Sequence, residues 1–273
     1  MSTRPQSVSS ALTVLDFPKR KASQTPISML TCYDFTFARL LNSTDVDVLL
    51  VGDSVAMVVH GHPSTLHADV DMMALHTAAV RRGAPDKFIV ADMPFLSVRR
   101  GLEFAMNAVA ALMRAGANAI KIEGADGQLD LMRHIVLSGI PVMGHLGLTP
   151  QSVEAFGGHK VQGRTEGAAA EVFAAAKAVE GTGAFALVLE CVPAVLAERV
   201  TRELLIPTIG IGAGSTTDGQ VLVLHDMLGC SPAFKPKFLR HYAQSHELVC
   251  DAVTRFHGDV LGRTYPSQSE SYT

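Results

Sequence analysis

The sequence lacks the features that mark several large classes of protein. Its four cysteines are far apart and form no Cys-x-x-Cys pair, which argues against a disulfide framework and favours a reducing compartment. The net charge is −3, whereas a nucleic-acid-binding protein normally carries a basic stripe. No apolar run approaches the roughly 18 residues that cross a bilayer. We therefore expect a cytoplasmic protein without nucleic-acid or membrane partners.

Residues 1–23 also lack the apolar core of a secretory signal. They are rich in serine and contain few acids, so a short transit peptide and a first helix are both open, and we expect the helix. The chain does contain enough apolar material for a large core, since 48% of its 273 residues are hydrophobic and 18% are charged. This length is within the usual range of one α/β barrel.

Short apolar runs rich in β-branched residues recur along the chain, and most of them end in a polar residue. The runs are 28–34, 46–54, 87–93, 118–124, 141–147, 185–191, 206–214 and 221–226. Segments with helical apolar spacing lie between several of them, namely 70–82, 102–115 and 167–181. A glycine just past a helix end is the usual left-handed cap. Such glycines precede the next run at Gly83, Gly116, Gly139 and Gly183.

Alternation of strand and helix indicates parallel strands covered by helices. Eight repeats predict a (β/α)8 barrel, with an open doubly wound sheet as the alternative. Only the sequence STTDGQ (215–220) separates the last two runs, so we expect a single turn there. The expected organisation is one domain over residues 1–273. It comprises a helical lead-in (1–27), the barrel (28–229) and a C-terminal helix and tail (230–273).

Four of the runs bring an acid to the carboxyl end of a strand, where the active site of such a barrel lies. These acids are Asp53, Asp92, Glu123 and Glu190. The first three come from consecutive strands and can surround one point, and their hard oxygens suit Mg²⁺. The alternative is that each acid caps a helix or pairs with an arginine.

Lys121 and Glu123 are two residues apart and face the same side of a strand. A lysine that points into a barrel is unfavourable unless it is paired or used. We expect Lys121 to bind an anionic substrate, which is compatible with an ion pair to Glu123 or Asp92. Glu190 has apolar neighbours that suit it to accept a proton, with a paired carboxylate at the rim as the alternative. His145 is placed to hydrogen-bond a ligand.

The loop after the second run contains several histidines that suggest a zinc site at first sight. They are His60, His62, His67 and, further on, His76. Their spacing matches no compact zinc signature. We therefore expect solvated or loop histidines and no zinc site.

With these residues assembled, longer stretches resemble the ketopantoate hydroxymethyltransferase family. The likeness runs in register from about residue 28 to 240. The most specific stretches are GHLGLTPQSV (144–153) and FGGHKVQGR (156–164), and LLVGDSVAMVVHGHPSTL (49–66) and MRAGANAIKIEG (113–124) also match. The sequence has Val55-Ala56 where many relatives have Leu-Gly, and His60 where glutamine is frequent, so loop closure can differ.

The resemblance implies a barrel of the phosphoenolpyruvate mutase/isocitrate lyase superfamily and a homodecamer. Members of the family transfer a hydroxymethyl group from 5,10-methylenetetrahydrofolate to 3-methyl-2-oxobutanoate. The product is 2-dehydropantoate, in pantothenate biosynthesis, and one Mg²⁺ is expected per subunit.

The resemblance also implies roles for particular residues. Asp53, Ser54, Asp92 and Lys121 would bind the keto acid. Asp53, Asp92 and Glu123 would bind the metal, and Glu190 would be the proton acceptor. Two alternatives stay open. The first is a magnesium-dependent carbon–carbon or phosphorus–carbon lyase or mutase that acts on oxaloacetate-like acids. The second is a barrel without catalytic activity that serves as a scaffold.

Overall fold

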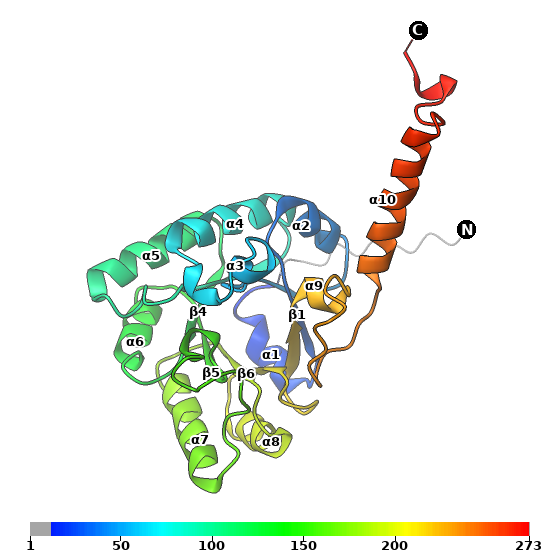
Figure 1. Cartoon of the computed structure of the whole chain (residues 1–273). Helices are drawn as coiled ribbons and strands as arrows, with labels where there is room; N and C mark the ends of the chain where they lie inside the picture. Colours follow the sequence, from blue (N-terminus) through cyan, green and yellow to red (C-terminus); the bar gives the residue numbers. More distant parts are fainter. Residues whose placement is uncertain (1–11, 273) are drawn as a thin grey trace. The chain divides into compact units, whose positions relative to one another are not determined.

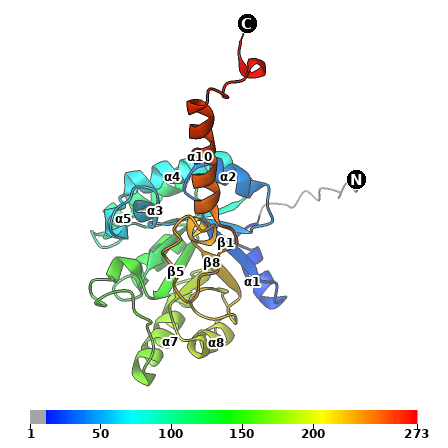
Figure 2. The same ribbon diagram turned by 45° about the vertical axis from the view of Figure 1, so that its right-hand side comes forward.

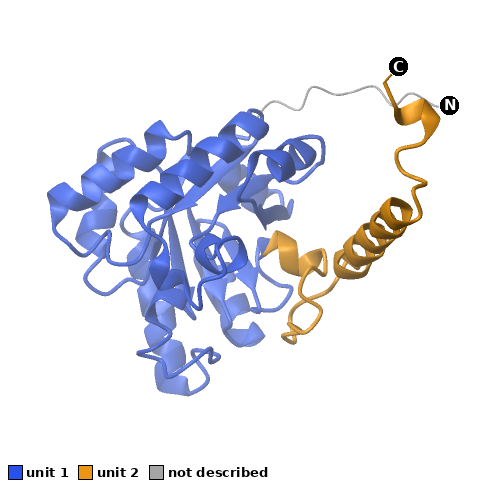
Figure 3. Ribbon diagram, turned by 45° about the horizontal axis from the view of Figure 1, so that its top comes forward, with its two compact units in different colours: residues 1–222 blue, residues 223–273 orange. Residues whose placement is uncertain are grey.

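The computed structural model describes residues 12–272 and divides the chain into two compact units (Figure 3). The first unit extends to Leu222 and the second begins at Val223. The first eleven residues of the predicted lead-in lie outside the described part. The single domain over 1–273, with its inner boundaries, stays a prediction.

The first unit is built around a closed barrel of parallel strands that pair in sequence order, with the last strand beside the first (Figures 1 and 2). The strands are β1 (Ile27–Thr31), β2 (Val48–Val51), β3 (Phe88–Asp92), β4 (Ala119–Glu123), β5 (Val142–Gly147), β6 (Ala186–Glu190), β7 (Thr208–Ile211) and β8 (Gly219–Leu222). The predicted (β/α)8 barrel is confirmed, and the open sheet is excluded because β1 pairs with both β2 and β8.

Helices cover the outside of these strands, as Figures 1 and 2 show. They are α2 (Phe35–Asn42), α3 (Val55–Val58), α4 (Val70–Gly83), α5 (Leu102–Arg114), α6 (Leu129–Leu137), α7 (Glu166–Glu180) and α8 (Ala194–Glu203). Two 3₁₀ turns, η1 (Thr65–His67) and η2 (Pro150–Ser152), lie in the loops after β2 and β5. The three helical segments predicted from apolar spacing correspond to α4, α5 and α7.

The predicted helix before the barrel is α1 (Asp16–Ala22). Its Phe17 is fully buried, and its ring lies 5.1 Å from the ring of Phe88 and 4.8 Å from that of Phe185. Phe88 begins β3 and Phe185 directly precedes β6, so this aromatic cluster lies at the amino ends of the strands. The carboxyl ends of the strands, where the active sites of (β/α)8 barrels lie, are at the opposite end of the barrel from this cluster.

The connection between β7 and β8 differs from the expected single turn. Residues 212–218 form bends without a helical turn. Gly212 and Gly214 have φ values of 62° and 82°, which a right-handed turn cannot accommodate. The eighth run is also shorter as a strand than predicted, because β8 ends at Leu222 and residues Leu224–Met227 form the short helix α9.

Three of the four predicted glycine caps are confirmed, since Gly116, Gly139 and Gly183 have φ between 86° and 110°. Gly83 is the exception, because it is the last residue of α4 and its φ is not positive. A Cβ at this position would lie 2.5 Å from the carbonyl oxygen of Phe35 and 2.7 Å from Cβ of Ala38. Glycine is required here by the close approach of α2.

The second unit contains α9, the helix α10 (Ser245–Leu261) and the 3₁₀ turn η3 (Gln268–Glu270). Helix α10 corresponds to the predicted C-terminal helix, and none of its residues is buried. Within residues 12–272, no helix combines the length and the apolar character that a bilayer span needs.

Gly83 and Gly167 offer a matched test of helix packing. We expect Gly83→Ala to lower the free energy of unfolding by about 1–3 kcal/mol, because the new methyl group overlaps α2. Gly167→Ala in α7 meets no atom within 4 Å and should be neutral or stabilising by up to about 1 kcal/mol. Urea denaturation measures both, and equal stability of the two variants would contradict the packing argument.

Candidate active site

The register of the barrel brings the predicted polar residues together at the carboxyl ends of neighbouring strands. Asp53 is the second residue after β2, while Asp92, Glu123 and Glu190 end β3, β4 and β6. Asp92 is the register partner of Lys121, and Glu123 is the partner of His145. Since adjacent strands are about 4.8 Å apart, these side chains can touch. We call Asp53, Asp92, Lys121, Glu123, His145 and Glu190 the acidic cluster.

Lys121 lies at the centre of the acidic cluster and is only 4% exposed. Its Nζ is 3.0 Å from Oδ1 of Asp92 and 4.0 Å from Oε1 of Glu123. Burial alone would lower the pKa of Lys121, but the charges of Asp92, Glu123 and Asp53 raise it above its ordinary value. The lysine is therefore a permanent cation, and both ion pairs considered from the sequence are present.

His145 links this lysine to Glu190. Its Nδ1 is 3.1 Å from Lys121 Nζ and 3.4 Å from Glu123 Oε1, and its Nε2 is 3.2 Å from Glu190 Oε2. Burial and the charge of Lys121 oppose protonation of the ring. The contacts with Glu123 and Glu190 outweigh both and raise the pKa of His145 to about 9. Each ring nitrogen therefore faces a carboxylate oxygen, although Nε2 makes no hydrogen bond of acceptable geometry.

The remaining carboxylates are not balanced by these cations. Asp53 and Asp92 are each 3% exposed, and the backbone N–H of Asp53 donates to Oδ2 of Asp92 at 3.1 Å. Burial raises the pKa of Asp53 well above its usual range, and the charges of Glu123 and Asp92 add to the effect. Burial also raises the pKa of Asp92, although Lys121 opposes it. Lys121 and His145 together cannot compensate the four carboxylates of the cluster.

These two aspartates fit a divalent cation. Oδ1 of Asp92 is buried and makes no hydrogen bond of acceptable geometry, even though Lys121 is near. Across residues 12–272, no three His, Cys, Asp or Glu side chains are arranged to enclose an ion by themselves. Mg²⁺ does not need such a cage, because it usually binds one or two carboxylates and keeps several waters. The donor set fits magnesium with an incomplete protein shell.

Glu123 is occupied differently from the two aspartates. Its Oε1 faces Lys121 and His145, and its Oε2 accepts the backbone N–H of Gln151 at 3.1 Å. Burial alone would raise the pKa of Glu123, but the contact with His145 and the charges of His145 and Lys121 lower it. Glu123 is therefore an ionised residue that organises the cluster.

Glu190 is more accessible than the other acids, with 18% of its side chain exposed. The next residue, Cys191, has a φ of 48°, which is unfavourable for a residue with a side chain. A Cβ at Gly147, the register partner of Glu190, would lie against the Glu190 carbonyl oxygen. The backbone at the end of β6 is thus held in a tight and unusual path.

Sequence reasoning missed two contacts of the site. The side-chain amide of Gln151 in η2 donates to Oδ2 of Asp53 at 2.8 Å. The hydroxyl groups of Tyr33 and Ser54 are 2.7 Å apart, which places Ser54 beside Asp53 with a fixed side chain. Both Tyr33 and Gln151 lie within stretches that carry the family resemblance, but nothing in their spacing indicated a role.

Other polar residues lie outside the acidic cluster. Asp34, which ends the first run, caps α2 by accepting from the backbone N–H of Phe37 at 2.9 Å. The ring nitrogens His60 Nε2 and His76 Nε2 are 2.8 Å apart, and the rings of His62 and His67 stack at 4.5 Å. The histidines therefore pair with one another across the loop after β2 and, at His76, the middle of α4.

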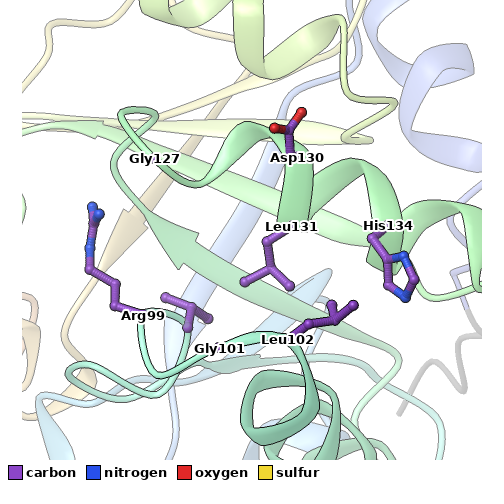
Figure 4. Close-up of a pocket in the computed structure, with 8 residues that line it drawn as sticks. Arg99, Gly101, Leu102, Gly127, Asp130, Leu131 and His134 are labelled. Atoms are coloured by element: carbon purple, nitrogen blue, oxygen red, sulfur yellow. The ribbon is translucent and has the colours of Figure 1, made fainter.

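A cavity of about 630 Å³ lies away from the acidic cluster (Figure 4). It is formed by the loop before α5 and by α6, and Figure 4 shows Leu102 and Leu131 facing each other across it. Its lining residues are Val98, Arg99, Gly101, Leu102, Gly127, Asp130, Leu131 and His134. Because it contains no member of the acidic cluster, we do not assign the chemistry to it.

The closed barrel with acids at the carboxyl ends of its strands defines a class of α/β-barrel enzymes. A phosphonopyruvate hydrolase solved in complex with oxalate and Mg²⁺ is similar, with a TM-score of 0.64 and 12% identity. The match covers 95% of this chain and 93% of that chain. A 2,3-dimethylmalate lyase of the phosphoenolpyruvate mutase/isocitrate lyase superfamily has a TM-score of 0.59 and 18% identity, covering 81% and 84%. These likenesses show the same α/β-barrel fold.

Sequence comparison then gives the family. Residues 11–268 match the model of ketopantoate hydroxymethyltransferase. A 3-methyl-2-oxobutanoate hydroxymethyltransferase of Bdellovibrio bacteriovorus is 54% identical over 261 residues, which are 96% of this chain and 99% of the relative. The chain belongs to the ketopantoate hydroxymethyltransferase family, as its motifs indicated, and it is a hydroxymethyltransferase. This replaces the lyase or mutase alternative and the scaffold alternative.

The raised pKa of His145 gives a pH-dependent contribution to stability. Its value is about 9 in the folded protein and 6.5 ordinarily, so the contribution is complete below pH 6.5 and is lost as the pH rises through 9. We expect the difference in unfolding free energy between the metal-free parent protein and His145→Gln to shrink over this range. Urea denaturation at several pH values measures it, and a constant difference would refute the assignment.

Proposed function

We propose that the acidic cluster is the active site at which this chain transfers a hydroxymethyl group to 3-methyl-2-oxobutanoate. The observation that carries the proposal is the buried set of carboxylates around a single lysine. Such a set is unfavourable in the empty protein but suits a metal ion together with an anionic keto acid. The relatives carry the name of this reaction.

Asp53 and Asp92 would hold Mg²⁺, directly or through water, and Glu123 would complete or orient the shell. A bound Mg²⁺ supplies Lewis-acid stabilisation of the negative charge that develops on the keto acid during the reaction. Glu123 contributes by fixing Lys121 and His145 through its Oε1 atom.

Lys121 and Ser54 would bind the keto acid, together with the two aspartates. The ammonium group of Lys121 stays charged, so it can attract the substrate carboxylate and stabilise developing charge nearby. The Ser54 hydroxyl is held by Tyr33 at 2.7 Å, which fixes the direction in which it can donate or accept. Both groups are already in place before substrate arrives.

Glu190 would remove the proton from C3 of the substrate. It is the most exposed acid of the cluster, and its Oε2 is beside His145, which carries positive charge near neutral pH. The proton would move to the Glu190 carboxylate, and the electron pair freed at C3 would attack the iminium carbon derived from methylenetetrahydrofolate, so that the carbon–nitrogen π pair returns to nitrogen. Water would then supply the hydroxyl oxygen as the remaining carbon–nitrogen bond breaks and tetrahydrofolate leaves. His145 keeps Glu190 oriented while this happens.

Several further features are proposed from the family resemblance. The one-carbon donor would be 5,10-methylenetetrahydrofolate, and one Mg²⁺ would bind per subunit. The enzyme would be cytoplasmic and would assemble as a homodecamer. Each of these is separable from the assignment of the cluster.

Replacing Glu190 tests the base directly. We expect Glu190→Gln to bind the keto acid normally but to slow exchange of the C3 proton with solvent by about 10²- to 10⁴-fold, because the amide cannot accept the proton. Exchange into deuterated water, followed by NMR, measures the rate. Glu171→Gln on the exposed face of α7 is the matched control. Exchange at the parent rate in Glu190→Gln would remove Glu190 from this role.

Replacing Asp92 tests the metal position. Asp92→Asn preserves the size of the side chain but removes one of the two proposed ligands and the ion pair with Lys121. We expect activity to fall and the Mg²⁺ concentration for half-maximal activity to rise by at least tenfold, in line with the loss of a ligand. Asp45→Asn, at an exposed position, should titrate like the parent. An unchanged metal titration in Asp92→Asn would place the ion elsewhere.

A further inference from the structure

Gln151 makes three hydrogen bonds to the ends of three different strands. Its side-chain Nε2 donates to Oδ2 of Asp53 at 2.8 Å and to the carbonyl oxygen of Met93 at 2.9 Å. Its backbone N–H donates to Oε2 of Glu123 at 3.1 Å. Because both side-chain partners are acceptors, the amide nitrogen must face them, and the orientation of the amide is determined.

The residue lies in a long loop that is fixed at both ends to β6. The loop covers residues 148–165, between β5 and α7, and contains only the short η2. The backbone N–H of Leu148 donates to the Glu190 carbonyl oxygen at 2.8 Å, and that of Gln162 donates to the Cys191 carbonyl oxygen at 2.9 Å. Gln151 therefore fastens the same loop to the β2, β3 and β4 side of the mouth.

The chemistry of an amide suits this position better than that of a cation. A lysine or arginine beside Asp53 would neutralise the carboxylate and compete with a metal ion. A neutral donor occupies one oxygen of Asp53 without adding a positive charge that would compete with a metal ion. It also restricts rotation of the carboxylate, which is how outer-shell partners commonly orient metal ligands.

We propose that Gln151 is a positioning residue of the active site, which holds Asp53 oriented for a divalent cation while its backbone holds Glu123 toward Lys121. This inference rests on the proposed function, because it presupposes that Asp53 binds the ion. It assigns to the loop after β5 an indirect part in metal binding. Gln151 itself need not touch the substrate or the metal.

Metal binding tests the inference without relying on turnover. Mn²⁺ serves as the probe, and its affinity is measured by calorimetry and by electron paramagnetic resonance on the full-length protein. Gln151→Met keeps the volume and the backbone N–H but removes both side-chain hydrogen bonds. Gln162→Met is the matched control, since its side chain donates only to Lys160 of the same loop. Asp53→Asn reports on the proposed function itself.

We expect Gln151→Met to weaken Mn²⁺ binding by about 10- to 100-fold, the usual effect of losing an outer-shell partner. Gln162→Met should bind like the parent. Saturating metal should restore most of kcat in Gln151→Met, which a general structural defect would not allow. Parent-like affinity in Gln151→Met, with binding abolished in Asp53→Asn, would overturn the role of Gln151 alone. Parent-like affinity in Asp53→Asn would overturn the metal site and the inference together.

Discussion

The structure depends on one electrostatic constraint, which is that a single lysine is buried among more carboxylates than it can neutralise. Barrel register makes the arrangement unavoidable, because Asp92 and Lys121 are register partners on β3 and β4 and Glu123 lies two residues beyond Lys121 on the same strand. Burial keeps water from screening the repulsion, so the imbalance persists unless a cation enters. A positively charged ligand would therefore bind favourably, because it would reduce the repulsion among the buried carboxylates. Ligand binding and folding are thermodynamically linked as a consequence.

The groups around this lysine divide into those that supply charge and those that only direct it. His145 supplies charge, and it lies between the buried acids and the more accessible Glu190. Gln151 and Tyr33 are neutral and act on Asp53 and Ser54. In the proposed site, such neutral groups direct the carboxylates without cancelling their charge. This separation is consistent with a neutral amide, and not a further lysine, beside Asp53.

The sequence was sufficient to predict the barrel and the acidic cluster because both follow from local patterns. Apolar strand runs alternate with helical segments along the chain, and an acid that ends a buried strand must reach water or meet a cation. Gln151 could not be found this way, since it lies in a loop without periodicity and its partners are distant in the chain. Gly83 was misassigned as a cap for a related reason, because its requirement comes from contact with α2. The end of β8 at Leu222 could not be predicted either, because the apolar run continues without a break into α9.

The aromatic cluster of Phe17, Phe88 and Phe185 has a consequence for how such a protein can change over evolutionary time. Phe88 and Asp92 begin and end the same strand, so the aromatic cluster and the acidic cluster are about 13 Å apart along β3. Substitutions in the loops at the carboxyl ends of the strands can alter ligand preference without disturbing the aromatic cluster. Substitutions within the aromatic cluster can alter the stability of the fold without moving the acids. Selection can therefore act on durability and on chemistry almost independently.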